Sequence, residues 1–276
     1  MDDDVINDYS LEDGEQLTMD NNSKNIVLRM HVANVFFRYI IGKRAQTKLN
    51  IESDTNTKLK IPRESTDSSV TTAIASSNDD LNFIKIIGRD KRSVLKTRKR
   101  IISLVDSFRA KQNITHFVAI PIGFFNNSNN LNSLHIRQRF IEFKNTILSD
   151  PSCSKLMGID ESVFHHPFRL HLTIRPLYLG DSYERKQAAR LLKEFKTDFL
   201  DQMMMIEDNN DPILLRVKGL DIMNDDPSEA QVLYAKVEEI EQDQKDKKKR
   251  FKEIVNNLFE RFKKTKIHSF VFIFFF

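Results

Sequence analysis

The stretch that decides the fold of this chain is residues 40–52, IIGKRAQTKLNIE. An apolar helical run that ends at Gly42, two cations, and an immediate return to helix-forming residues predict two helices joined by a very short turn. Glycine permits close approach of another molecule to the backbone, while Lys43 and Arg44 supply positive charge. Ala45 is expected to be the first residue of the second helix. Such a turn can hold a phosphodiester backbone with its free amides and side chains.

The flanking segments predict a small α+β domain around this turn. Residues 25–32, 57–61 and 81–87 alternate between apolar and polar side chains, which is typical of strands. Residues 90–111 predict a long amphipathic helix, because Val94, Ile101, Val105 and Phe108 share one face. The opposite, cationic face is expected to hold Lys96, Arg98, Lys99 and Arg100. The predicted order is therefore β-α-α-β-β-α, with a polar loop at 64–80.

This order, with Ile-Ile-Gly at the turn between the helices, resembles a eukaryotic-type KH domain, in which a GXXG loop clamps single-stranded nucleic acid. Ala45 replaces the second Gly of the family motif. The resemblance implies that the nucleic-acid-binding residues are Ile41, Gly42, Lys43, Arg44 and Ala45. An apolar groove beside the loop is expected from Ile40, Ile41, Leu49 and Ile61. The alternative is a small α/β domain whose Lys-Arg turn is merely solvated.

Charge is unevenly distributed along the 276 residues, whose net charge is +4. Residues 1–23 carry eight acidic and no basic side chains, so the rest of the chain is strongly basic. We expect residues 1–24 to be a disordered acidic tail, and the basic remainder to meet a polyanion. Cys153 is the single cysteine, which excludes an intrachain disulfide and a Cys-rich zinc site and favours a reducing compartment. We predict no secretory signal and no membrane partner, because the apolar run 270–276 is far shorter than the roughly 20 residues that span a bilayer.

A second informative stretch is residues 168–179, FRLHLTIRPLYL. In an extended strand, alternate side chains point to opposite faces, so Leu170, Leu172 and Ile174 are expected in the core. The other face would present Arg169, His171, Thr173 and Arg175. An imidazole, a hydroxyl and two guanidinium groups in a row are a suitable surface for a phosphate.

The remaining pattern continues with alternating helices and strands. Strands are predicted at 115–121, 213–220 and 231–237, and helices at 132–148, 181–200 and 244–264. From Thr115 onward the chain resembles the two-histidine phosphoesterase fold, in the branch of the A-kinase anchoring protein nuclear-localisation domain. A KH domain followed by this fold, together with GLDIMNDDP at 219–227 and VLYAKV at 232–237, resembles a family of signal cointegrator complex subunits. The resemblance covers about residues 25–265.

The predicted organisation is an acidic tail at 1–24, a KH domain at 25–112, an incomplete phosphoesterase-like domain at 113–266, and a non-family tail at 267–276. The phosphoesterase family uses two His-x-Thr/Ser motifs without a metal, one His as base and the other as acid. His171 and Thr173 match the first motif, and Arg169 and Arg175 are implied phosphate ligands. No other histidine has Ser or Thr two positions on, so the second motif is missing. We expect a truncated or mis-spliced C-terminus, and we interpret His165 and His166 as a loop pair rather than a metal site.

Three functions remain open. The resemblance implies a subunit that binds single-stranded RNA or DNA in a nuclear complex, acts in transcription coactivation and alkylation-damage repair, and has a helicase and other cointegrator subunits as partners. The alternative is a metal-independent RNA phosphoesterase, which this chain with its single motif is not expected to be. A further alternative is a non-catalytic scaffold. No cofactor is predicted, and the expected location is the nucleus, with or without the cytoplasm.

Overall fold

The computed structural model describes residues 11, 15–20, 23–62, 82–123, 131–157, 159–206, 213–223, 226–230, 232–240 and 250–265. The chain forms two compact units. Unit 1 combines Met1–Asn113, Tyr178–Phe199 and Arg261–Ser269, and unit 2 combines Ile114–Leu177, Leu200–Glu260 and Phe270–Phe276. The predicted polar loop at 64–80 and the tail at 267–276 lie outside the described residues.

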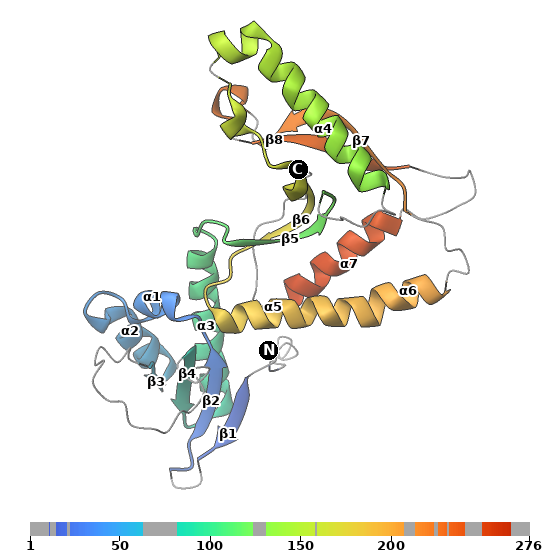
Figure 1. The fold of residues 1–276 in the computed structure, drawn as a ribbon. Helices are drawn as coiled ribbons and strands as arrows, with labels where there is room; N and C mark the ends of the chain where they lie inside the picture. The colour runs from blue at the N-terminus through green and yellow to red at the C-terminus, as the bar shows by residue number, and fades with distance from the viewer. Residues whose placement is uncertain are drawn as a thin grey trace, which may run out of the picture. The chain divides into compact units, whose positions relative to one another are not determined.

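Unit 1 is built on a four-stranded antiparallel sheet in the order β1-β2-β4-β3 (Figure 1). Its elements are β1 (Gln16–Met19), β2 (Ile26–His31), α1 (Phe37–Ile41), α2 (Gln46–Thr55), β3 (Thr57–Lys60), β4 (Phe83–Gly88), α3 (Lys91–Arg109) and α5 (Ser182–Phe195). The predicted order β-α-α-β-β-α is present from β2 to α3. The α+β class predicted for the chain is confirmed.

The core of unit 1 lies between the sheet and the three helices α1, α2 and α3. The strands bury every second side chain, as their alternation predicts, and contribute Leu28, Met30, Leu59, Ile84 and Ile86. The helices add Ile40, Ile51, Val94 and Ile101, and the short helical turn before α1 adds Phe36. Asp90 caps α3 by accepting a hydrogen bond from the Ser93 amide at 2.8 Å, so the helix starts where the sequence indicates.

The N-terminal segment corrects the prediction of a wholly disordered acidic tail. Gln16–Met19 form β1 and pair antiparallel with β2. The carboxylate of Glu15 accepts hydrogen bonds from Arg98 Nε at 2.9 Å, and both side chains are buried. The prediction that Arg98 lies on the solvent-exposed face of α3 is therefore wrong. Glu15, which the sequence places in the acidic tail, neutralises Arg98 inside the fold.

Residues 178–199 belong to compact unit 1, so the compact units differ from the predicted contiguous domains 25–112 and 113–266. Asp181 caps α5 by accepting from the Glu184 amide, and its other oxygen contacts His31 Nε2 at 2.9 Å. Arg109 donates to both carboxylate oxygens of Glu184 and to the Tyr178 carbonyl. These buried polar contacts join a helix that is distant in sequence to the sheet and to α3.

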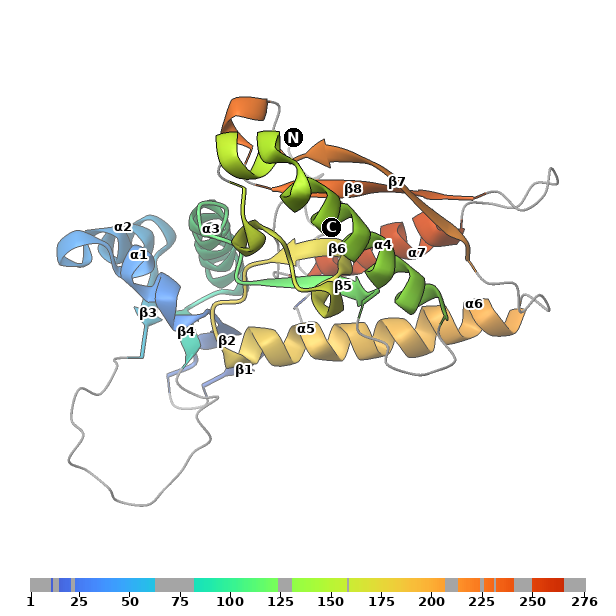
Figure 2. The same cartoon turned by 45° about the horizontal axis from the view of Figure 1, so that its top comes forward.

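Unit 2 contains two antiparallel strand pairs and several helices (Figures 1 and 2). Its elements are β5 (His116–Pro121), α4 (Leu131–Ser149), β6 (His171–Leu177), α6 (Asp201–Ile206), β7 (Leu215–Ile222), β8 (Leu233–Glu239) and α7 (Arg250–Lys264), the last turn of which belongs to unit 1. Figure 2 shows β5 beside β6, and their pairing shifts register between Val118 and Ala119. None of the described helices is long and apolar enough to cross a membrane.

Candidate nucleic-acid interface and phosphate site

The turn between α1 and α2, residues 42–45, is referred to as the GKRA loop. Gly42 ends α1, and its amide donates to the Arg38 carbonyl at 2.9 Å. Its φ is +70°, and a Cβ added here would lie 2.1 Å from Thr47 Oγ1. Glycine is therefore required both by the backbone conformation and by the close packing of α2.

The second half of the GKRA loop corrects a prediction about Ala45. Arg44 has φ 52° and ψ 33°, and Ala45 has φ 60° and ψ 15°, so both are left-handed. Ala45 is the N-cap of α2 and not its first helical residue. Ala45 therefore has a left-handed backbone conformation, which glycine adopts more readily than alanine does.

We predict that Ala45→Gly stabilises the protein by about 1 kcal/mol, because a left-handed non-glycine residue costs about that much. If Ala45 were inside a helix, its replacement by glycine would instead lower the free energy of unfolding. Urea denaturation of the two proteins measures the difference. Equal or lower stability of the glycine variant would contradict the left-handed geometry.

Exposure determines which predicted binding residues can contact a ligand. Lys43 and Arg44 are exposed, and Ile41, Gly42 and Ala45 are partly exposed. Ile40 is 0% exposed and belongs to the core, so the prediction that it lines the groove is wrong. Leu49 is 52% exposed and Ile61 is partly exposed, which leaves both available beside the loop.

His171 opens strand β6, and its ring is held on two sides. Nδ1 lies 2.7 Å from the Arg169 carbonyl oxygen, and the ring stacks on Phe117 with centroids 4.7 Å apart. A carbonyl oxygen can only accept a hydrogen bond, so Nδ1 carries the proton. In the neutral ring, Nε2 then holds the lone pair that a base or a hydrogen-bond acceptor needs.

The strand around His171 differs from the prediction of one core face and one open polar face. Pro167–Arg169 form a helical turn, so Arg169 precedes the strand and its side chain is exposed. Thr173 and Arg175 are only 5% and 4% exposed, as well buried as their apolar neighbours. Phe259 of helix α7 packs against Arg175, and a bulge interrupts the alternation between Thr173 and Arg175.

Arg175 is occupied inside unit 2. Its guanidinium carbon lies 4.4 Å from the centroid of the Phe259 ring, and Nη1 donates to the Phe259 carbonyl at 3.5 Å. Burial lowers the pKa of Arg175, and the negative charge of Glu260 acts in the opposite direction. Arg175 is therefore an internal cation and not the open phosphate ligand that was predicted.

Thr173 carries the clearest sign of a ligand on this strand. Its Oγ1 is buried and has no hydrogen-bond partner among the residues that the structure describes. A buried hydroxyl without a partner costs free energy, so such groups generally face a bound water or ligand. Unlike Thr173 Oγ1, the His166 ring has a hydrogen-bond partner: its Nδ1 accepts from the Phe168 amide at the start of the preceding turn.

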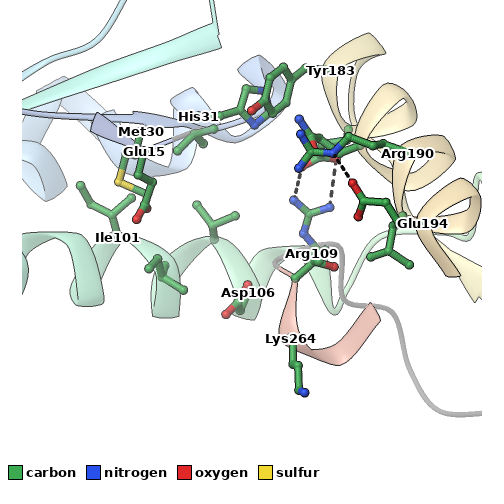
Figure 3. Close-up of a pocket in the computed structure, with 17 residues that line it drawn as sticks. Glu15, Met30, His31, Ile101, Asp106, Arg109, Tyr183, Arg190, Glu194 and Lys264 are labelled. Carbon is green, nitrogen blue, oxygen red and sulfur yellow. Dashed lines mark hydrogen bonds and ion pairs between the residues drawn. The ribbon is translucent and has the colours of Figure 1, made fainter. Parts of the chain in front are cut away.

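Unit 1 also contains a pocket of about 300 Å³ that the sequence did not reveal (Figure 3). It is lined by β2, α3, α5 and the last residues of α7, with Arg109, Arg190 and Lys264 near Asp106, Glu184 and Glu194. Arg190 pairs with Glu194 at 3.4 Å. No sequence motif indicates this pocket, because these charged residues come from three separate helices, α3, α5 and α7.

Comparison with known families accounts for both halves of the chain. Residues 114–269 match the model of the AKAP7 2'5' RNA ligase-like domain, which is more than half of the chain. The chain belongs to this family. Residues 27–103 match the KH domain model, so the predicted resemblance is confirmed in both parts. A KH domain is a nucleic-acid-binding module, and the GKRA loop lies inside the matched residues.

A curated relative has the same combination. The chain is 32% identical over 229 residues to activating signal cointegrator 1 complex subunit 1 of Mus musculus, covering 83% of this chain. It spans about half of that relative, 55% of its length. The residues matched by the family model include 178–199, which belong to unit 1, so the family domain is not one compact unit in this fold.

Proposed function

We propose that this protein binds single-stranded RNA or DNA and that the GKRA loop is the element that clamps the backbone. The observation that carries the proposal is the geometry of the loop. Gly42 and two left-handed residues turn the chain between α1 and α2, which leaves Lys43 and Arg44 exposed at the tip. Cations and free amides at such a turn attract phosphate, and the partly exposed Ile41, Leu49 and Ile61 offer apolar contacts to bases.

The test is a titration of the full chain with labelled single-stranded and duplex oligonucleotides at several salt concentrations. We expect preference for single strands, because the apolar contacts need unstacked bases. Two phosphate contacts from the loop should make the logarithm of affinity fall with the logarithm of salt by a slope of about −1.4 or steeper. Equal affinity for duplex, or affinity that is independent of salt, would contradict the proposal.

Within the same proposal, the chain is a subunit of a nuclear signal cointegrator complex. The partners of the chain would be a helicase and the other subunits of the complex. The chain would act in transcription coactivation and in the repair of alkylation damage. The name of the mouse relative, which describes a complex subunit, supports this assignment. The GKRA loop would then supply the contact of the complex with single-stranded nucleic acid.

A second candidate function, phosphate binding in unit 2, is favoured by the buried Oγ1 of Thr173. We propose that Thr173 and the Nε2 atom of His171 contact a phosphate or nucleotide. The exposed Arg169, next to His171 in the preceding turn, could neutralise it. The fixed proton on Nδ1 suits His171 to accept a proton, but a cleavage reaction also needs a group that gives one.

We predict that this chain binds a 2',5'-linked dinucleotide weakly and does not hydrolyse it or a 2',3'-cyclic phosphodiester at a useful rate. A positioned acid or base typically contributes about 10²–10⁴-fold, and His171 can supply only one of the two. Calorimetry measures binding, and chromatography of the incubated substrate measures turnover. Rapid metal-independent hydrolysis that His171→Ala removes would overturn this prediction.

A further inference from the structure

The sheet of unit 1 has a second face, which does not pack against α1, α2 and α3. Alternation places the core residues Leu59, Ile84 and Leu28 on the helix side, so their sequence neighbours point to the other side. We call this the outward face. It carries Arg29 from β2, Lys85 from β4, and Lys58 and Lys60 from β3, of which the three lysines are exposed.

The cations of the outward face lie directly beside one another. Lys60 pairs in register with Lys85, and Lys85 pairs in register with Arg29, so three positive charges cross three adjacent strands in one row. Like charges at directly opposite positions of an antiparallel sheet are destabilising. No acidic residue occupies an outward position on any of the four strands, all of which are described.

Several other cations of this unit pair with acidic side chains. Arg98 pairs with Glu15, Arg100 with Asp54, and Lys48 with Glu52. On the strands of the outward face, by contrast, none of the residues paired in register with these cations is acidic. Such a row is stabilised by a polyanion that neutralises several charges at once.

The outward face also carries apolar side chains. The Arg29 guanidinium lies over the Phe83 ring at 4.1 Å from its centroid, and the same ring packs against His31 and Tyr183. Half-buried Val27 and Ile87 lie in the row next to the cations. Cations beside apolar side chains suit single strands, because phosphates pair with the cations while unstacked bases contact the apolar groups. This favours nucleic acid over an acidic protein surface.

The outward face is connected to the GKRA loop through one short helix. α2 begins after Ala45 and runs to Thr55, and β3 begins at Thr57 after the single residue Asn56. A helix of this length spans about 15 Å, which a few nucleotides can cover. β3 is also the edge strand of the sheet, so a strand can pass around it without crossing another element.

We propose that the outward face is a second contact site for the phosphodiester backbone of single-stranded nucleic acid. Lys58, Lys60, Lys85 and Arg29 bind phosphates of the strand that the GKRA loop clamps. This inference rests on the proposed function of the loop, and it predicts a binding site that is longer than the loop alone provides.

The test compares two fluorescent oligouridylates, of about 5 and about 12 nucleotides, because a KH loop clamps only about four. Each is titrated with the full chain and with a Lys58→Gln, Lys60→Gln, Lys85→Gln variant. We expect unchanged affinity for the short oligomer. For the long one, three lost phosphate contacts should flatten the salt slope by about 2 and weaken binding roughly 10–100-fold at 0.1 M salt.

A matched control changes three exposed cations on other elements: Arg185→Gln, Lys193→Gln and Lys252→Gln. It removes the same net charge and should leave both oligomers bound as in the wild type. Equal affinity of the outward-face variant and wild type for the long oligomer would overturn the proposal, as would an equal loss in the control. The short oligomer tests the GKRA loop separately. If only variants of the loop lose binding to the short oligomer, the loop proposal stands even when the outward-face proposal fails.

Discussion

Replacing both Lys43 and Arg44 by Asp is expected to abolish measurable binding of single-stranded RNA while the protein stays folded. Both side chains are exposed, and neither belongs to the core. Two attractive phosphate contacts become two repulsive ones, so affinity falls well beyond the effect of neutralising the charges. Folding should be preserved, since exposed substitutions usually change stability by less than about 0.5 kcal/mol.

The choice of Asp is also favourable to the fold, because Asp tolerates the left-handed conformation of Arg44 better than most residues do. Fluorescence anisotropy measures the affinity, and circular dichroism with urea measures the fold. The matched control is Arg185→Asp with Lys186→Asp, an exposed basic pair on α5 with the same change of charge. Unchanged RNA affinity in the loop variant, with the control also unchanged, would remove the GKRA loop from the site.

The elements from β2 to α3 could be predicted because each carries its own local signal. Strands that bury one face alternate with period two, and α3 combines an apolar stripe with an Asp cap. The conformation of Ala45 could not be predicted in the same way. Its methyl side chain gives no sign of the left-handed backbone that the structure shows at this position.

Buried charges account for most of what the sequence concealed in unit 1. Glu15 looks like one acid among many in an acidic segment, yet it neutralises Arg98 from 83 residues away. Periodicity reports which residues are apolar, but it cannot report which polar residue finds a distant partner. For the same reason, the placement of α5 in unit 1 has no local signal.

The strand at His171 shows a different limit. Alternation indicates that two faces differ, but it does not indicate whether the second face is open to solvent. Alternation predicts that Arg175 lies on a polar face open to phosphate, whereas Phe259 of α7 covers its guanidinium group. The assignment of His171 and Thr173 depends on their His-x-Thr spacing together with the surrounding family resemblance, and it stays a proposal.

Glu184→Ala is expected to have the largest effect on stability. Arg109 donates to Glu184 through Nη1 at 3.1 Å and Nη2 at 2.5 Å, and the Gly180 amide donates to Glu184 Oε2 at 2.7 Å. The side chains of Arg109 and Glu184 are only 5% and 7% exposed. Removing the carboxylate leaves a buried guanidinium without its counter-charge, which typically costs about 3–5 kcal/mol.

Such a loss is a large part of the roughly 5–15 kcal/mol that stabilises a typical domain, so the variant should unfold at a much lower urea concentration. Glu194→Ala on the same helix is the matched control. Glu194 pairs with Arg190 at the surface, with both side chains about half exposed, and should contribute less than about 1 kcal/mol. Similar unfolding midpoints for the two variants would contradict a buried ion pair that joins α5 to α3. A large difference would show that residues 178–199 stabilise the KH fold, and that a fragment ending near residue 112 lacks part of its core.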